Sequence, residues 1–194
     1  ERGATPLLVY RNERPLGLIS VADEIRPCAR ETVAALCAMN IDHVGILSGD
    51  HERSACMIAE SVGLDRAWAQ MMPEDKPRVV KEFQERGKTV VFVGDGINDA
   101  PALATANVGI AMGDAGTNVA LEASDIALMN DDISKIPFLI RLGRRMLTVI
   151  KRNIALGMLF NVLAVAAGGA GFLSPIMGAL VHNIGSVVVV ISSA

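Results

Sequence analysis

Apolar residues change their spacing several times along the chain, and each spacing predicts a different secondary-structure element. Short apolar runs at 5–10 and 15–21 flank the polar tetrapeptide RNER, which predicts a β-hairpin. Farther along, apolar runs of strand length alternate with segments whose apolar residues recur with helical spacing. Alternation of strands and helices is typical of a parallel sheet covered by helices on both faces. We therefore predict an α/β fold for residues 1–140.

The limits of the single elements follow from the turn residues between them. A helix over 74–87 is expected to stop at Gly87, because glycine is favoured just past the end of a helix. The other predicted helices lie at 26–40, 52–64, 100–106 and 116–124. The predicted strands after the hairpin lie within 42–50, which contains a strand and a loop, and at 65–73, 88–96, 107–113 and 125–130.

Charged residues stop at Arg152, although the chain continues to Ala194. The composition is 51% hydrophobic with a mean hydropathy of +0.39, which is high for a purely soluble protein. The uncharged segments 154–173 and 175–194 are each long enough to cross the hydrocarbon core of a bilayer. We predict a second domain, 141–194, that contains these two transmembrane helices as a hairpin, and basic residues before the first place its start in the cytosol. Two buried helices of a soluble protein are the alternative.

The cysteines Cys28, Cys37 and Cys56 have no CxxC spacing. Their odd number leaves at least one of them outside any internal disulfide. We expect all three to be reduced, buried, small apolar side chains, which suits a cytosolic compartment.

Polar clusters follow three of the predicted strands directly. Ser48, Gly49 and Asp50 follow one strand, the segment 73–76 follows the next, and the segment 95–99 follows a third. In open parallel sheets, ligands bind outside the carboxyl ends of the strands. The three clusters are therefore predicted to converge on one crevice.

The side chains in these clusters suit phosphate chemistry. Asp95 and Asp99 repel each other unless a cation lies between them. Hard oxygen ligands with room for water suit Mg²⁺, and protein-bound Mg²⁺ commonly binds phosphate groups of a substrate. Lys76 offers a point charge to phosphoryl oxygens, while the Ser48 hydroxyl and the Gly49 amide offer hydrogen bonds. An isolated Gly-Asp-Gly is usually a plain turn, but the three clusters in this order favour a phosphate-handling site.

The segment GDGINDAPALATANVGIAMG at 94–113 resembles the hinge motif of P-type ATPases, whose phosphorylation domain belongs to the haloacid dehalogenase class. ILSGD is similar to the family's Thr-Gly-Asp segment, with Ser48 in the Thr place, and PEDK is similar to its Pro-x-x-Lys. The resemblance implies a haloacid-dehalogenase-like parallel sheet in an ATP-hydrolysing enzyme. The catalytic residues that it implies are Ser48, Gly49, Asp50, Lys76 and Asn98.

The same resemblance implies the cofactors Mg²⁺ and ATP. It places Mg²⁺ at Asp95 and Asp99. The segment DEIRP resembles the point where the nucleotide domain rejoins the phosphorylation domain, so Asp23 and Arg26 are expected to contact or gate ATP.

Three signatures of P-type ATPases are missing from this sequence. They are Asp-Lys-Thr-Gly-Thr, whose Asp receives the phosphoryl group, Thr-Gly-Glu, and a membrane Cys-Pro-Cys or similar motif. All three precede this region in the family's chain order. We therefore expect the C-terminal portion of a longer pump of the plasma (inner) membrane, with 1–140 in the cytosol. Without the phosphorylated Asp, this portion alone is expected to be inactive.

Two membrane helices after the hinge motif resemble the heavy-metal (type IB) P-type ATPases. The candidate ligands of the transported ion are Asn161, His182, Asn183 and Ser186. An imidazole with carbonyl and hydroxyl oxygens suits a divalent Mn, Zn, Cd or Co ion better than the soft Cu(I). The pattern resembles, except at Gly185, a His-Asn-x-Ser-Ser variant tied to manganese or zinc export. A copper(I) pump of the same family is the alternative.

Two other functions fit the soluble part. A membrane-anchored phosphatase of the haloacid dehalogenase class needs a nucleophile upstream but no ion site. A non-catalytic, membrane-tethered phosphate-binding module needs neither. For the pump, the expected partners are ATP, a transition-metal cation and the lipid bilayer, with no nucleic acid.

Overall fold

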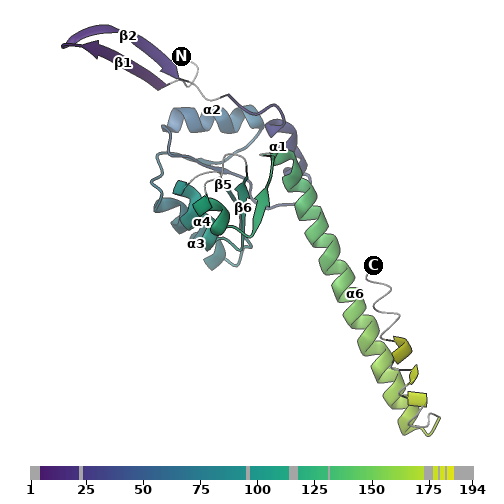
Figure 1. The fold of residues 1–194 in the computed structure, drawn as a ribbon. Helices are drawn as coiled ribbons and strands as arrows, with labels where there is room; N and C mark the ends of the chain where they lie inside the picture. The colour runs from purple at the N-terminus through teal and green to yellow at the C-terminus, as the bar shows by residue number, and fades with distance from the viewer. Residues whose placement is uncertain are drawn as a thin grey trace. The chain divides into compact units, whose positions relative to one another are not determined.

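The computed structural model of the chain describes residues 5–21, 24–94, 97–113, 118–130, 132–172, 177–178, 180–181 and 183–185. The chain divides into two compact units, Glu1–Pro137 and Phe138–Ala194. Figure 1 shows strands and several helices in the first unit, and one long helix, α6, in the second.

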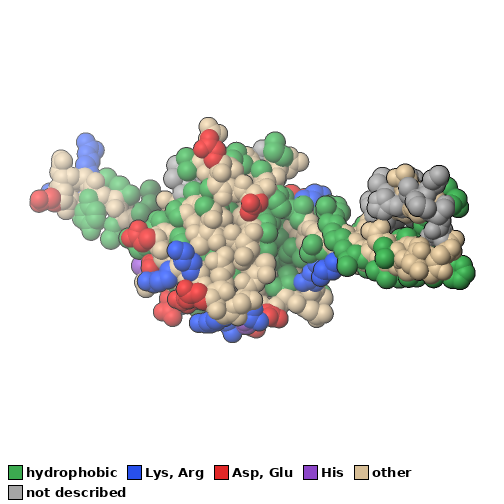
Figure 2. Space-filling model, turned by 90° about the horizontal axis from the view of Figure 1, so that it is seen from below, with side chains coloured by type: hydrophobic (Ala, Val, Ile, Leu, Met, Phe, Trp, Pro, Cys, Tyr) green, Lys and Arg blue, Asp and Glu red, His purple; other side chains and the backbone are tan. Residues whose placement is uncertain are grey.

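The predicted hairpin is formed by the antiparallel strands β1 (Thr5–Arg11) and β2 (Arg14–Val21). The turn residues Asn12 and Glu13 have φ angles of 48° and 66°, and a type I′ turn requires positive φ at both positions. Apolar side chains on the hairpin are exposed, Leu8 at 61% among them, and green atoms cover much of its visible face in Figure 2. An isolated two-stranded hairpin is only marginally stable in water, so contacts among its own side chains give this hairpin little stability.

The remaining strands of the first unit pair in parallel. One sheet contains β3 (Ile46–Leu47) and β4 (Ala67–Trp68). The other contains β5 (Val91–Gly94), β6 (Val108–Met112) and β7 (Ile126–Leu128) in that order. The predicted α/β class with a parallel sheet is confirmed. Each strand is shorter than its predicted segment, because the polar ends of the segments belong to loops.

Helices alternate with these strands, as predicted. They are α1 (Ala29–Cys37), α2 (Glu52–Val62), α3 (Asp75–Glu85), α4 (Ala100–Thr105) and α5 (Asn118–Glu122), with 3₁₀ turns η1 (Ile97–Asp99) and η2 (Ile133–Lys135). The predicted stop at Gly87 is confirmed. Gly87 has a φ of 74°, and its N–H donates to the carbonyl of Gln84, a helix-ending geometry that glycine adopts without strain.

The core beside the larger sheet combines a few large side chains with several alanines. Its buried residues are Val80, Phe92, Ala102, Leu103, Ala111 and Ala120, and Leu47 of β3 packs against them. The helix α4 lies directly on β6. A Cβ added to Gly109 of β6 would come within 2.6 Å of the Leu103 carbonyl oxygen of α4, which shows how closely the two elements pack. This close packing fixes η1, which immediately precedes α4, at the carboxyl end of β5.

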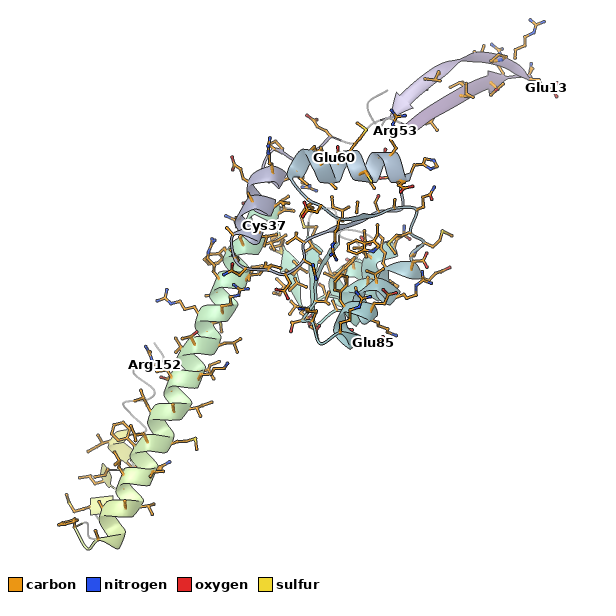
Figure 3. All side chains as sticks on the ribbon, turned by 180° about the vertical axis from the view of Figure 1, so that it is seen from behind. Glu13, Cys37, Arg53, Glu60, Glu85 and Arg152 are labelled. Atoms are coloured by element: carbon orange, nitrogen blue, oxygen red, sulfur yellow. The ribbon has the colours of Figure 1, made fainter. Side chains whose placement is uncertain are left out.

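The expectation of buried cysteines is wrong. All three thiols are free, as expected, but Cys37 and Cys56 are exposed and Cys28 is half-buried; Cys37 is labelled in Figure 3. The buried face of α2 is formed by Ala55, Ala59 and Val62 instead. Since Cys56 follows Ala55 directly, it lies about 100° around the helix and outside that face.

The helix α6 (Ile136–Gly169) covers much of the first predicted span but has different ends. It begins well before 154, with Pro137 in its first turn, where proline is tolerated. It ends before the predicted limit at 173, because Gly171 adopts a φ of 79° and Phe172 N–H donates to the Ala167 carbonyl, as in a Schellman motif. The segment Ile133–Gly169 is long and apolar enough to cross a membrane.

The second predicted span, 175–194, lies mostly outside the described residues. Of its length, 177–178, 180–181 and 183–185 are described, and they are helical. Its full extent therefore stays a prediction.

Candidate functional site

The loop that follows β3 is joined to the loop that follows β4 by backbone hydrogen bonds. Ser48 N–H donates to the Trp68 carbonyl at 2.8 Å, and Met71 N–H donates back to the Ser48 carbonyl at 3.0 Å. Gln70 N–H donates to the Asp50 carbonyl at 2.8 Å. The two polar loops predicted to meet at a strand end are thus held together.

Within the first loop, Ser48 and Asp50 orient each other. The Ser48 hydroxyl donates to Oδ2 of Asp50 at 3.0 Å, and Asp50 N–H donates to the Ser48 oxygen at 3.1 Å. Ser48 is half-buried, whereas Gly49 and Asp50 are exposed. The arrangement leaves the Gly49 amide and the Ser48 oxygen near solvent, on a loop of fixed conformation.

Lys76 lies in the first turn of α3, which a side chain of that turn helps to position. Oδ2 of Asp75 accepts a hydrogen bond from Met72 N–H at 3.0 Å, and Asp75 also pairs with Arg78 at 2.9 Å. A carboxylate in the first turn is favourable beside the unsatisfied N–H groups there. These contacts fix the start of α3 and therefore the position of Lys76 in its first turn.

The structure brings Lys76 and Asp99 together. Nζ of Lys76 donates to Oδ1 of Asp99 at 2.6 Å, and the two side chains are only 14% and 12% exposed. A nearly buried ion pair of this kind depends on both partners, because removing one leaves an uncompensated charge out of water. Two of the three predicted clusters therefore share one centre.

Asp99 lies against the end of β5, and Gly94 makes this possible. A Cβ added to Gly94 would come within 2.6 Å of Cβ and 2.9 Å of Oδ2 of Asp99. A Cβ atom essentially never comes within 3.0 Å of a non-bonded heavy atom, so something would have to shift. The glycine before Asp95 thus provides the space in which the Asp99 carboxylate sits beside the strand.

We expect Gly94→Ala in the full-length protein to displace the Asp99 side chain and weaken its contact with Lys76. Overpacking of this kind costs about 1–3 kcal/mol of unfolding free energy, which chemical denaturation measures. The control is Gly143→Ala, because a Cβ added there meets nothing within 4 Å. Equal stability of the two variants would contradict the close packing of Asp99 on β5.

The other predicted site residues are placed as follows. Asn98 is exposed in η1, Arg26 is exposed before α1, Asn161 is exposed on α6, and Asn183 is exposed in its short helical stretch. Asp23, Asp95, His182 and Ser186 lie outside the described residues. Among the residues that the structure describes, no three His, Cys, Asp or Glu side chains form a group able to hold a metal ion.

One contact near the site was missed by the sequence analysis. Gln70 has a φ of 52°, which is uncommon for a residue other than glycine, and its Nε2 lies 3.5 Å from Nδ1 of His51. Both side chains are exposed and connect the loops after β3 and β4. The available signal was a polar residue two positions after Trp68, the last residue of β4.

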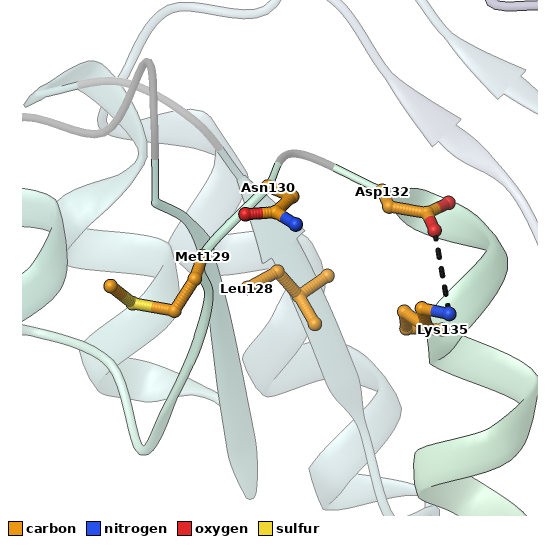
Figure 4. A pocket seen from close by; sticks show the side chains of 5 residues that line it. All are labelled: Leu128, Met129, Asn130, Asp132 and Lys135. Atoms are coloured by element: carbon orange, nitrogen blue, oxygen red, sulfur yellow. Dashed lines mark ion pairs between the residues drawn. The ribbon is translucent and has the colours of Figure 1, made fainter.

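The remaining electrostatic features lie at other places. The hydrogen bond and charge of Lys88 hold the pKa of Asp42 below its ordinary value, and hydrogen bonds from Ser134 lower the pKa of Asp132. Asp132 also pairs with Lys135 at 3.7 Å. These two residues line a hollow of about 180 Å³ after β7, shown in Figure 4 together with Leu128, Met129 and Asn130. The hollow is smaller than the usual binding pocket of a drug-sized ligand.

The parallel strands and the lysine–aspartate pair at the end of β5 agree with the protein family whose model matches the chain. The family model of haloacid dehalogenase-like hydrolases matches residues 1–107. The chain belongs to this family.

Individual similar proteins show which kind of hydrolase the chain resembles. The chain is 44% identical over 194 residues to a zinc-exporting P-type ATPase of Mycobacterium marinum, and 45% identical over 190 residues to a manganese-exporting P-type ATPase of Mycobacterium tuberculosis. These matches cover 100% and 98% of this chain and 26% of each relative. A cadmium-transporting ATPase of Staphylococcus aureus is 38% identical over 97% of this chain and 26% of its own length.

A solved structure agrees with these relatives. The crystal structure of a zinc-transporting PIB-type ATPase matches 99% of this chain and 31% of its own chain, with 34% identity and a TM-score of 0.86. The predicted resemblance to heavy-metal P-type ATPases is confirmed. The chain spans about a quarter of the length of the curated relatives that it matches.

Proposed function

We propose that this chain is the C-terminal portion of an ATP-driven pump that exports a divalent transition metal and cycles through an aspartyl phosphate. The observation that carries the proposal is the nearly buried Lys76–Asp99 pair at the end of β5, together with relatives that are metal-transporting P-type ATPases. In this proposal, 1–140 is the C-terminal part of the cytosolic phosphorylation domain. The segment 141–194 provides two transmembrane helices, at about 154–173 and 175–194, in the plasma (inner) membrane.

The proposed roles at the phosphorylation site follow from the contacts of the chain's own residues. Lys76 holds the Asp99 carboxylate and adds a positive charge beside the phosphoryl group. The Gly49 amide donates to one phosphoryl oxygen. The Ser48 hydroxyl gives up its hydrogen bond to Oδ2 of Asp50 to donate to another, while Asp50 N–H keeps its hold on the Ser48 oxygen. Asn98 orders the loop. Asp23 and Arg26 are proposed to contact or gate ATP.

The donor set fits Mg²⁺, which binds through one or two carboxylates and keeps several waters. Lys76 occupies Oδ1 of Asp99, so the carboxylates proposed for the ion are Asp95 and the second oxygen of Asp99. When bound, Mg²⁺ neutralises charge that builds up on the transferred phosphoryl group.

The phosphorylated Asp is proposed to come from an upstream segment of the full-length protein. Within the described residues, β3 and β5 each stand at the end of a sheet, and Leu47 of β3 packs on the core of β5–β7. A strand that carries this Asp has free edges to pair with there, next to Ser48 and the β5 loop. We infer that the present portion alone does not hydrolyse ATP.

The metal is proposed to be Mn, Zn, Cd or Co. Asn161, His182, Asn183 and Ser186 offer one imidazole nitrogen and several oxygens, a set that suits borderline divalent ions. The relatives are named for zinc export, manganese export and cadmium transport, which supports a divalent ion for this chain too.

We expect His182→Gln in the full-length pump to remain in the membrane and to accept phosphate from inorganic phosphate, yet to lose stimulation of ATP hydrolysis by Mn²⁺ or Zn²⁺. A purely structural His contributes only about 1 kcal/mol through an interhelical hydrogen bond, which Gln partly replaces. Metal-dependent ATPase assays on purified protein measure the difference. Unchanged half-saturating metal concentrations in the variant would contradict the divalent assignment and return Cu(I) as the leading metal.

A further inference from the structure

The positive charge of α6 is confined to the part of the helix that precedes its apolar length. Its Lys and Arg residues are Arg141, Arg144, Arg145, Lys151 and Arg152, here called the cationic stripe, and all of them are exposed. All 21 acidic residues of the chain precede Ile133. No acidic residue therefore lies on α6 itself.

Helical geometry places the whole cationic stripe on one side of α6. At 100° per residue, its members fall within an arc of about 120° and extend over about 17 Å of the helix axis. The opposite side over the same length carries the exposed apolar residues Leu142, Met146, Leu147 and Ile150. The charges are thus gathered into a single surface.

The cationic stripe leads directly into the apolar part of α6. The helix is continuous from Ile136 to Gly169, and no charged residue follows Arg152. The label of Arg152 in Figure 3 marks the last charge on the helix, partway along its length.

The position along the helix sets the depth of the cationic stripe. If the hydrocarbon core begins near Asn153, Lys151 and Arg152 lie within about 3 Å of its edge along the axis, at headgroup level. Arg145 lies about 12 Å from the edge, where an anionic surface still attracts it, because the Debye length is about 8 Å at physiological salt.

We propose that the cationic stripe binds anionic lipid headgroups on the cytosolic face of the membrane. Charge complementarity, headgroup depth and direct continuity with the apolar length favour lipid over an acidic protein segment. Clusters of Lys and Arg next to a membrane helix gain affinity for anionic lipids in this way. The inference requires that α6 cross a bilayer, but it requires neither ATP nor a transported metal.

The test uses the full-length protein in mixed vesicles of phosphatidylglycerol and phosphatidylcholine, extracted into detergent with its bound lipids and examined by native mass spectrometry. The stripe variant is Arg141→Gln/Arg145→Gln/Lys151→Gln. The control variant, Arg30→Gln/Arg66→Gln/Lys81→Gln, removes the same charge from exposed positions of the first unit. A third variant, Arg141→Lys/Arg145→Lys, keeps the charge of the stripe.

We expect the stripe variant to lose bound phosphatidylglycerol relative to phosphatidylcholine by at least about fivefold, the effect of one cation at the membrane surface. The control and the Lys variant should retain it, and raised salt should reduce it in the wild type. Equal enrichment in the stripe and control variants would overturn the proposal. So would a stripe variant whose ATPase activity changes while its phosphatidylglycerol enrichment stays at the wild-type level, because the stripe would then contact protein.

Discussion

Lys76→Ala in the full-length protein is expected to lower the rate of phosphoryl transfer from ATP by about 10²-fold or more, which corresponds to about 3 kcal/mol of transition-state stabilisation. The side chain places a positive charge next to Asp99 at 2.6 Å, and both side chains have little access to water. The matched control is Lys81→Ala, an exposed lysine on the same helix. Quench-flow measurement of phosphoenzyme formation separates this step from the rest of the cycle.

Loss of rate through unfolding is distinguished by a second variant. Removing Lys76 alone leaves the Asp99 charge unpaired, which costs on the order of 3 kcal/mol of stability for a buried pair. The double variant Lys76→Met/Asp99→Asn should recover most of that stability, yet remain defective in phosphoryl transfer. If the double variant also recovers the transfer rate, or if Lys76→Ala hydrolyses ATP normally, Lys76 has only a structural role.

Asp95→Asn is expected to abolish formation of the acid-stable phosphoenzyme at limiting Mg²⁺. The substitution keeps the size of the side chain but removes a negative ligand, so the phosphoryl charge is no longer compensated through the ion. Phosphoenzyme on acidic gels, measured over a range of Mg²⁺ concentrations, reports this effect. Wild-type levels at the lowest Mg²⁺ concentration would contradict the proposed role of Asp95.

The arrangement of the first unit was largely predictable because each element has a local cause. Apolar runs of strand length identify the strands, helical spacing of apolar residues identifies the helices, and Gly87 marks the end of α3 where the structure has it. The lengths of the strands were not predictable. The strands β3 and β4 end where polar residues form loops. Ser48 and Asp50 hold these loops by hydrogen bonds to residues distant in sequence, which local patterns do not show.

Part of the site could be predicted from the order of its clusters, but not the pairing inside it. The shared ion of Asp95 and Asp99 stays a prediction, and no sequence pattern indicated that Oδ1 of Asp99 contacts Lys76, which lies 23 residues earlier. No local spacing encodes such a contact. It depends on how α3 and η1 pack around the end of β5.

The ends of α6 show a further limit of sequence patterns. The change from charged to uncharged residues near Arg152 predicted a boundary, but the helix continues through it. Arg, Leu, Lys and Met all favour helix formation, so a change of charge alone gives no reason to break the backbone. The actual end depends on Gly171 and its positive φ.

In our proposal, the full-length protein moves a divalent transition metal with ATP. The most direct measurement is uptake of radioactive zinc, manganese, cadmium or cobalt into inside-out vesicles, with phosphoenzyme formation followed in the same preparation. We predict accumulation of at least one of these ions that requires ATP and Mg²⁺ and is absent in Asp95→Asn. Phosphoenzyme formation and transport that respond to Cu(I) alone, or no ATP-dependent uptake of any of these metals, would contradict the account.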